Sequence, residues 1–109
     1  MIIELVSISV PRSKRQQIGR ALASFVGPIE VQAGCRSCRL FQSWPTQDRL
    51  LVEARWEDQE GLIRHLQSDI YKELLLLIEL SASPPSLEFL TVVEYRGLDL
   101  VEAARTESS

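Results

Sequence analysis

Hydrophobic and polar residues alternate at the start of the chain in the way that is typical of a β-strand. In residues 2–10 (IIELVSISV) the even positions are apolar except for Glu4. In residues 12–26 the apolar positions instead recur at a spacing of three or four, with Arg and Gln on the opposite side, which predicts an amphipathic helix. The segment 27–34 (GPIEVQAG) is expected to break this helix.

Two strands joined by a short turn are predicted next. Residues 35–44 form the first, Pro45 ends it, and residues 48–56 form the second. Because so few residues separate them, they should pair as a hairpin.

A second helical region and a last strand complete the pattern. Asp58 is a good N-cap for one helix, and Ser68 or Asp69 can cap its continuation. Pro84 and Pro85 stop it. The remaining segments are a strand over 86–95, a short amphipathic helix over 98–105 and a frayed tail, TESS.

The order β-α-β-β-α-β predicts an α+β, ferredoxin-like fold with a four-stranded antiparallel sheet. Residues 1–97 form this domain, and 98–109 are a terminal helix and tail. Both helices lie in one layer on one face of such a sheet, so the other face stays bare and must pack on something. A second copy of the chain is the simplest cover, so we expect a homodimer.

Composition narrows the classes of partner. The chain has 109 residues with a net charge of -3, which argues against a nucleic acid or an anionic membrane as partner. Its basic residues cluster in RSKRQQIGR, interpreted as a solvated helix face. No apolar run approaches the roughly 20 residues of a membrane span. The first residues lack the features of a signal peptide, so the expected location is the cytoplasm.

The two cysteines, Cys35 and Cys38, have the spacing C-x-x-C. In a regular strand, residues three apart point to opposite faces, so these thiols should neither pair nor share a metal. A zinc site needs further ligands, and the chain offers one histidine and no other cysteine. A structural role is favoured over redox chemistry and over a metal site.

From Ala33 to His65 the residues resemble a known family. AGCRSCRLFQSW and LLVEARWEDQEGLIRHLQSD are similar to the antibiotic biosynthesis monooxygenases, which are dimeric α+β barrels. The shared features are Gly34-Cys35 at a strand entry, Trp56-Glu57 at a strand end, and His65-Leu66 nine residues after the tryptophan. The resemblance covers residues 2–95.

The resemblance implies a cofactor-independent monooxygenase that acts on a phenolic, quinol or anthrone-like molecule with dioxygen. Such chemistry deprotonates the substrate to an electron-rich anion, which passes an electron to dioxygen. The protein then needs a pocket, a base and donors for the developing oxyanion. No metal or flavin is implied.

Trp56 and His65 are the candidate catalytic residues. His65 is the only histidine, and imidazole is a suitable general base near neutral pH. It shares a stripe with Leu62 and Leu66, so a buried core histidine is the competing interpretation. Trp56 shares a strand face with Val52, and an aromatic plug between sheet and helix is its alternative role.

Four further residues are candidates for substrate binding. Tyr71 and Tyr95 can donate to a phenolate, or pack at an edge. Ser7 and Ser9 lie on the less apolar side of the first strand, where they would line a cavity or tolerate a dimer interface.

The chain also departs from the family pattern. It contains no asparagine, a pocket residue in some anthrone oxygenases, and Ala54 stands where many relatives carry Glu. In the heme-degrading branch the iron-ligating histidine aligns with Leu75, and leucine cannot ligate iron, so heme degradation is disfavoured. The alternative to an enzyme is a dimeric barrel that binds a small ligand without turning it over.

Overall fold

A computed structural model describes residues 1–107 and contains one four-stranded sheet over this range. The order across the sheet is β2-β3-β1-β4, and every neighbouring pair is antiparallel. This is the predicted ferredoxin-like arrangement. The strands are β1 (Ile2–Ser9), β2 (Cys35–Gln42), β3 (Arg49–Trp56) and β4 (Ser86–Thr91).

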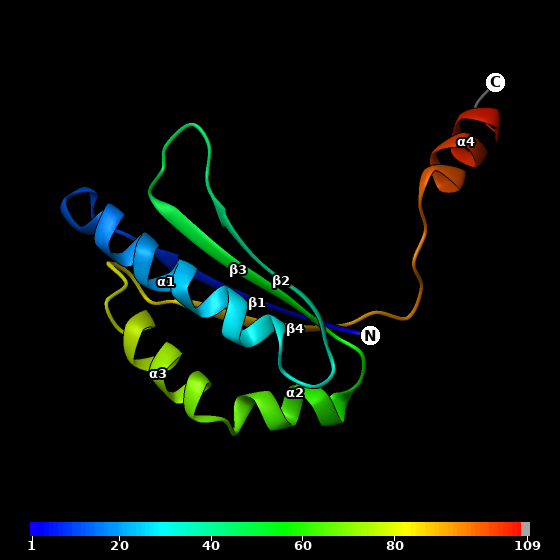
Figure 1. Cartoon of the computed structure of the whole chain (residues 1–109). Coiled ribbons are helices and arrows are strands. Elements are labelled where there is room, and N and C mark those ends of the chain that lie inside the picture. Colours follow the sequence, from blue (N-terminus) through cyan, green and yellow to red (C-terminus); the bar gives the residue numbers. More distant parts are fainter. Residues whose placement is uncertain (108–109) are drawn as a thin grey trace.

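Helices cover one face of the sheet, as Figure 1 shows. On that face α1 packs on β2 and β3, and α2 packs on β3, while α3 lies against α1. The fourth helix stands away from the body at the end of an extended segment (Figure 1). The helices are η1 (Arg12–Lys14), α1 (Arg15–Glu30), α2 (Gln59–Leu66), α3 (Asp69–Ile78) and α4 (Leu98–Glu107).

Several boundaries differ from the sequence-based expectation. The first helix does not break at 27–34 but continues through Pro28 to Glu30. Pro28 lies in the last turn, and Ile29 beside it is 1% exposed; burying such a side chain contributes about 2 kcal/mol, which offsets the missing N–H. The last strand ends at Thr91 instead of residue 95. The terminal helix reaches Glu107, and the rest of the expected frayed tail lies outside the described residues.

The core lies between the helices and the inward side of the sheet. Even-numbered positions of β1 face the helices, and Val6 is flanked by Val52 of β3 and Leu87 of β4. Val6 and Val52 are buried, as is Trp56 at the end of β3. The alternation in residues 2–10 therefore predicted the buried side correctly.

The outward side of the sheet is covered by no helix of the described chain. It presents Ile3, Leu5 and Leu51 half-buried, and Phe41 and Leu90 exposed. Ile3 pairs with Leu90 and Leu51 pairs with Phe41, and the polar side chains of Ser7, Glu53 and Arg55 lie among them on the same side. The bare face inferred from the element order is present.

The two cysteines correct the strand-parity prediction. A bulge between Cys35 and Ser37 inserts one extra residue, so Cys35 pairs with Trp56 and Cys38 with Ala54. Both thiols therefore lie on the helix-facing side, and the expectation of opposite faces is wrong. Both cysteines are free, and Cys38 is part of the core.

Among the described helices, none is long and apolar enough to cross a membrane.

Candidate functional site

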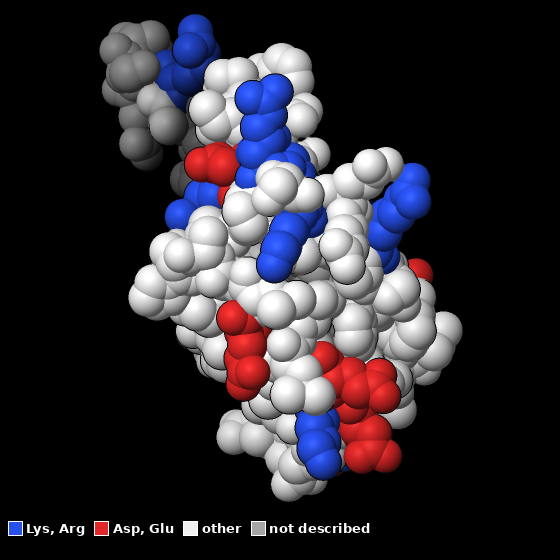
Figure 2. Space-filling model, turned by 90° about the vertical axis from the view of Figure 1, so that its left-hand side faces the viewer, with Lys and Arg blue, Asp and Glu red and all other residues white. Residues whose placement is uncertain are grey.

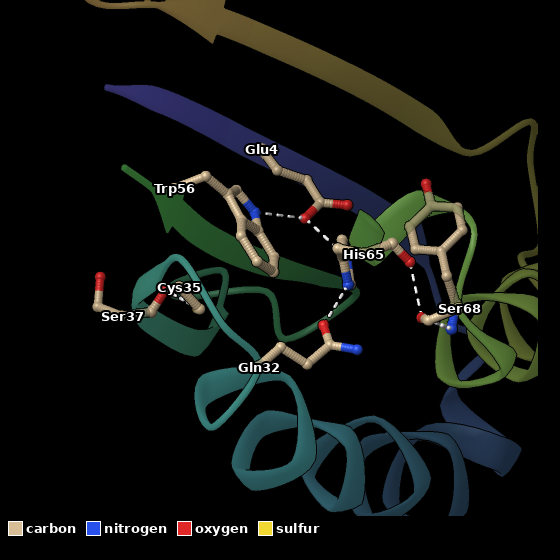
Figure 3. A network of polar contacts seen from close by, with 8 residues as sticks. Glu4, Gln32, Cys35, Ser37, Trp56, His65 and Ser68 are labelled. Carbon is tan, nitrogen blue, oxygen red and sulfur yellow. Dashed lines mark hydrogen bonds and ion pairs between the residues drawn. The ribbon is translucent and has the colours of Figure 1, made fainter. Parts of the chain in front are cut away.

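A cluster of polar and aromatic side chains is buried between β1, β3 and α2 (Figure 3). The carboxylate of Glu4 lies at its centre and is 2% exposed. The indole N–H of Trp56 donates to Glu4 Oε1 over 3.2 Å. His65 Nε2 lies 3.1 Å from the same oxygen, and His65 Nδ1 lies 2.6 Å from Gln32 Oε1. A single polar network thus joins Glu4 and Trp56 from the sheet, His65 from α2 and Gln32 from the loop after α1.

The contacts of His65 define where its protons lie. Gln32 Oε1 is an acceptor, so Nδ1 carries a proton and donates it. A neutral imidazole of that tautomer has an electron pair on Nε2, which a carboxylate oxygen at 3.1 Å would repel. The contact between His65 and Glu4 is therefore favourable only when one proton is shared by the pair, on the imidazole or on the carboxyl group.

The pair also keeps unused capacity for hydrogen bonds. Glu4 Oε2 is buried without a partner, and the approach of His65 Nε2 to Oε1 lacks the alignment of a hydrogen bond. Leaving such groups buried and unsatisfied costs about 1–3 kcal/mol each. A native core rarely retains that cost without a reason, and a site that accepts and releases protons is one such reason.

Aromatic rings enclose the imidazole of His65. Trp56 stacks on it with ring centroids 4.5 Å apart, and Tyr71 contacts it edge-on at 4.9 Å. Burial, with a smaller contribution from the charge of Glu4, raises the pKa of Tyr71 to about 12. The phenol therefore stays protonated at neutral pH and is a hydrogen-bond donor.

The turn between α2 and α3 fixes His65 and Tyr71 relative to each other. The hydroxyl of Ser68 donates to the His65 carbonyl oxygen over 2.7 Å and accepts from the Tyr71 N–H over 3.2 Å (Figure 3). Ser68 is thus the N-cap of α3, one of the two residues expected for that role. Asp58 caps α2 by accepting from the Gly61 N–H, as the sequence predicted.

The inward side of β4 lies beside this cluster and is only partly covered. Phe89 is the direct sheet neighbour of Glu4, and Leu87 is the neighbour of Val6. Phe89 is 43% exposed and Leu87 40% exposed, whereas Val6 in the same layer is 2% exposed. We call Leu87 and Phe89 the β4 strip. It is an apolar surface that adjoins the buried Glu4 in the sheet.

The structure brings together three of the sequence-predicted site residues, Trp56, His65 and Tyr71. Ser7 and Ser9 lie on the outward side of β1. There Ser7 Oγ accepts from Arg49, and Ser9 Oγ lies 2.7 Å from Ser83 Oγ.

Tyr95 lies beyond the end of β4, in the extended segment before α4, and is 76% exposed. Leu75, the position aligned with a heme ligand, is a partly exposed residue of α3.

Sequence reasoning did not include Glu4 and Gln32 in the site. Glu4 carried a signal, because it is the one polar residue among the inward positions of β1. Gln32 carried none, since it lies in the turn after α1 and nothing in its neighbours distinguishes it.

The cysteines near the cluster are unsuited to nucleophilic or metal chemistry. Burial, together with the charge of Cys35, raises the pKa of Cys38 to about 12, and burial also raises the pKa of Cys35. Both are protonated at neutral pH, whereas the thiolate is the reactive form. Within residues 1–107, no three His, Cys, Asp or Glu side chains gather as a metal site would require.

Comparison with known proteins gives a family match over most of the chain. The sequence profile of the family "Antibiotic biosynthesis monooxygenase" matches residues 1–75, which include β1, β2, β3 and the whole Glu4–His65 cluster. No curated protein sequence matches the chain.

Several solved structures share the fold. A candidate antibiotic biosynthesis monooxygenase from Deinococcus radiodurans has a TM-score of 0.79 at 13% identity, covering 89% of this chain and 97% of that one. One from Nitrosomonas europaea has a TM-score of 0.77 at 15% identity, covering 86% and 100%. A conserved protein from Methanosarcina mazei has a TM-score of 0.73 at 23% identity, covering 83% and 91%. At these identities the likeness shows the shared fold.

Proposed function

The chain belongs to the antibiotic biosynthesis monooxygenase family, and we propose that it is a cofactor-independent monooxygenase. Its substrates would be dioxygen and a small, electron-rich phenol, quinol or anthrone-like molecule. It would act as a homodimer in the cytoplasm.

The observation that carries this proposal is a buried base beside an open apolar surface. His65 Nε2 lies 3.1 Å from Glu4 Oε1, and Glu4 Oε2 is buried without a partner. Phe89, the sheet neighbour of Glu4, is 43% exposed. Directly opposite residues of an antiparallel pair have Cβ atoms about 5 Å apart. A flat substrate that lies on the β4 strip would therefore place an acidic O–H or C–H group near the free carboxylate oxygen.

The reaction balances without an external reductant. For an anthrone, the Glu4–His65 pair removes one proton from the CH₂ group, and the resulting anion passes one electron to dioxygen. The substrate radical and superoxide then combine to a peroxide anion, which takes a proton back. Loss of the second C–H proton and cleavage of the O–O bond release water and leave the carbonyl. The substrate supplies all four electrons, one oxygen atom enters the product, and the other becomes water.

The aromatic neighbours would serve the charged intermediates. Tyr71 stays a neutral phenol at neutral pH, so it can donate to the substrate anion or to the peroxide. Trp56 holds Glu4 Oε1 through its indole N–H, which leaves Oε2 for the substrate proton. Ser7, Ser9 and Tyr95 take no part in this proposal, since Ser7 and Ser9 lie on the other side of the sheet and Tyr95 lies in the extended segment.

The test is oxygen uptake by the purified protein with a panel of hydroquinones and anthrones. Glu4→Gln keeps the volume and an acceptor for Trp56 but removes the base, so we expect kcat to fall by about 10²–10⁴. Glu73→Gln is the matched control, because Glu73 is an exposed residue of α3, away from the cluster and from the outward side of the sheet. Its rate should be unchanged. Equal rates for wild type and Glu4→Gln would remove Glu4 from the mechanism.

Ligand binding without turnover is the second candidate function. It is favoured by the complete burial of Trp56 and His65, which are 0% and 1% exposed. If no member of the panel is oxidised although some of them bind, this second function replaces the first.

A further inference from the structure

A groove of about 710 Å³ lies between the first half of α1 and the edge strand β2. We call it the α1 groove. It is remote from the Glu4–His65 cluster, because Gln32 follows the other end of α1 and a helix of 16 residues is about 24 Å long. Arg12, Arg15 and Arg20 line the groove from one side, and Leu40 and Phe41 line it from the strand.

The three arginines of the α1 groove form no ion pair within residues 1–107. Arg15 Nε is also buried there without a hydrogen-bond partner. The one carboxylate of the neighbouring β2–β3 loop, Asp48, instead accepts hydrogen bonds from Ser43 and Thr46. The pKa of Asp48 is lowered mainly by its hydrogen bond from Thr46 and to a small extent by the charge of Arg15. Three guanidinium groups therefore line the α1 groove without an ion pair within residues 1–107.

The position of these charges opposes the stability of the helix. The start of an α-helix carries partial positive charge, so carboxylates stabilise it and cations do not. Here Arg15 opens α1, Arg12 and Lys14 precede it, and the first turn contains no acidic residue and no side-chain cap. A bound anion would remove this conflict.

The distribution of charge over this end of the molecule agrees with an anion site at the start of α1. The start of α1 lies on the side of Figure 1 that Figure 2 turns toward the viewer. Figure 2 shows Lys and Arg side chains mostly in the upper half of this face, and the largest group of carboxylates in the lower half.

Gly19 makes room in the middle of the α1 groove. It lies on the groove side of α1, and a Cβ atom added there would meet no atom within 4 Å. Glycine destabilises a helix interior by about 0.5–1 kcal/mol relative to alanine. The missing side chain leaves open space beside Leu40, which faces the helices and suits an apolar group.

We propose that the α1 groove binds a small organic oxyanion. The carboxylate or phosphate group contacts Arg12, Arg15 and Arg20, whose planar guanidinium groups match such oxyanions. The apolar body of the ligand lies over Gly19 against Leu40. This site is additional to the proposed oxidation site and does not depend on it.

The experiment is calorimetric titration of the full chain with phenyl phosphate, benzoate, inorganic phosphate and phenol. Phenyl phosphate or benzoate should bind at least tenfold more tightly than inorganic phosphate, which lacks the apolar body, and than phenol, which lacks the charge. Whichever of the two binds more tightly identifies the anionic group. Arg15→Gln should weaken that binding about tenfold or more, since hydrogen bonds to charged groups are among the strongest.

Two further variants decide between a built site and general attraction to positive charge. Lys14→Gln removes one charge from the same segment, but Lys14 faces a different hollow, beside Leu77 and Leu80, so binding should be unchanged. Gly19→Leu fills the groove with a good helix former and should abolish binding while the protein stays folded. The proposal is overturned if phenyl phosphate and benzoate do not bind, if Lys14→Gln weakens binding as much as Arg15→Gln, or if Gly19→Leu binds normally.

Discussion

At the scale of single residues, burial sets the protonation states of the core beside the sheet. Cys38 and Tyr71 are 2% and 6% exposed, and burial raises the pKa of each to about 12. In the unfolded chain the same groups titrate near 9.0 and 10.0. Above pH 9 the unfolded state therefore loses protons that the folded state keeps, and the free energy of unfolding falls as pH rises from 9 to 12.

This effect gives an expected result for Cys38→Ala. The variant loses some packing at every pH, but its free energy of unfolding should fall less than that of the wild type between pH 8 and pH 11, because one titrating group is gone. Urea unfolding at both pH values measures the difference. Val52→Ala is the control, since it truncates the same core without removing a titrating group, and its cost should be the same at both values. An equal fall in Cys38→Ala and wild type would contradict the assigned pKa shift of Cys38.

Single residues also show why the candidate site was only partly predictable. Trp56 and His65 stood out through their rarity and through their match to the family pattern. The polar exception at Glu4 fixed its inward direction, but its partners, Trp56 and His65, are 52 and 61 positions away. The bulge at Cys35–Ser37 was not predictable either, since an extra residue in one strand depends on its pairing with the other.

At the scale of elements, two glycines determine how closely α2 approaches the start of β2. Gly34 has φ +88°, and a Cβ atom there would lie 3.2 Å from the Cα atom of Gly61. The Gly34 carbonyl oxygen also accepts from the Glu57 N–H over 2.8 Å. This contact holds α2, the helix that contains His65, close to the end of β3, where Trp56 lies. The sequence predicted Gly34 at the entry of a strand, but only the structure shows that it meets Gly61.

Gly34→Ala should therefore destabilise the protein by about 1–3 kcal/mol, through the left-handed φ and the close contact with Gly61. Gly19→Ala provides the contrast, because Gly19 is helical, is not followed by proline, and a Cβ atom there meets nothing within 4 Å. That variant should be more stable by about 0.5–1 kcal/mol. Chemical denaturation of both variants measures whether each substitution lowers or raises the free energy of unfolding. A Gly34→Ala protein as stable as the wild type would show that the contact at Gly61 relaxes without cost.

At the scale of the whole molecule, the outward side of the sheet is an apolar surface that no other part of the described chain buries. Ile3, Leu5, Leu51, Phe41 and Leu90 form an apolar surface that the helices of the described chain leave uncovered. Monomeric proteins rarely expose a continuous apolar patch of more than a few hundred Å². The order of elements predicted this bare face, whereas the extended segment before α4 was predicted as strand. Residues 92–97 leave the sheet, and α4 lies apart from it (Figure 1).

A homodimer in which two outward faces pack together would bury this surface, and it gives the last expected result. Leu51 lies within the apolar surface, between Ser7 and Phe41 in the sheet. Leu51→Lys would place a charge in the interface of both subunits, so the protein should sediment as a monomer at micromolar concentration, where the wild type sediments as a dimer. Leu76→Lys is the control, because Leu76 is 61% exposed on α3. It should remain a dimer. A monomeric wild type, or a dimer that survives Leu51→Lys, would mean that something other than a second sheet covers this face.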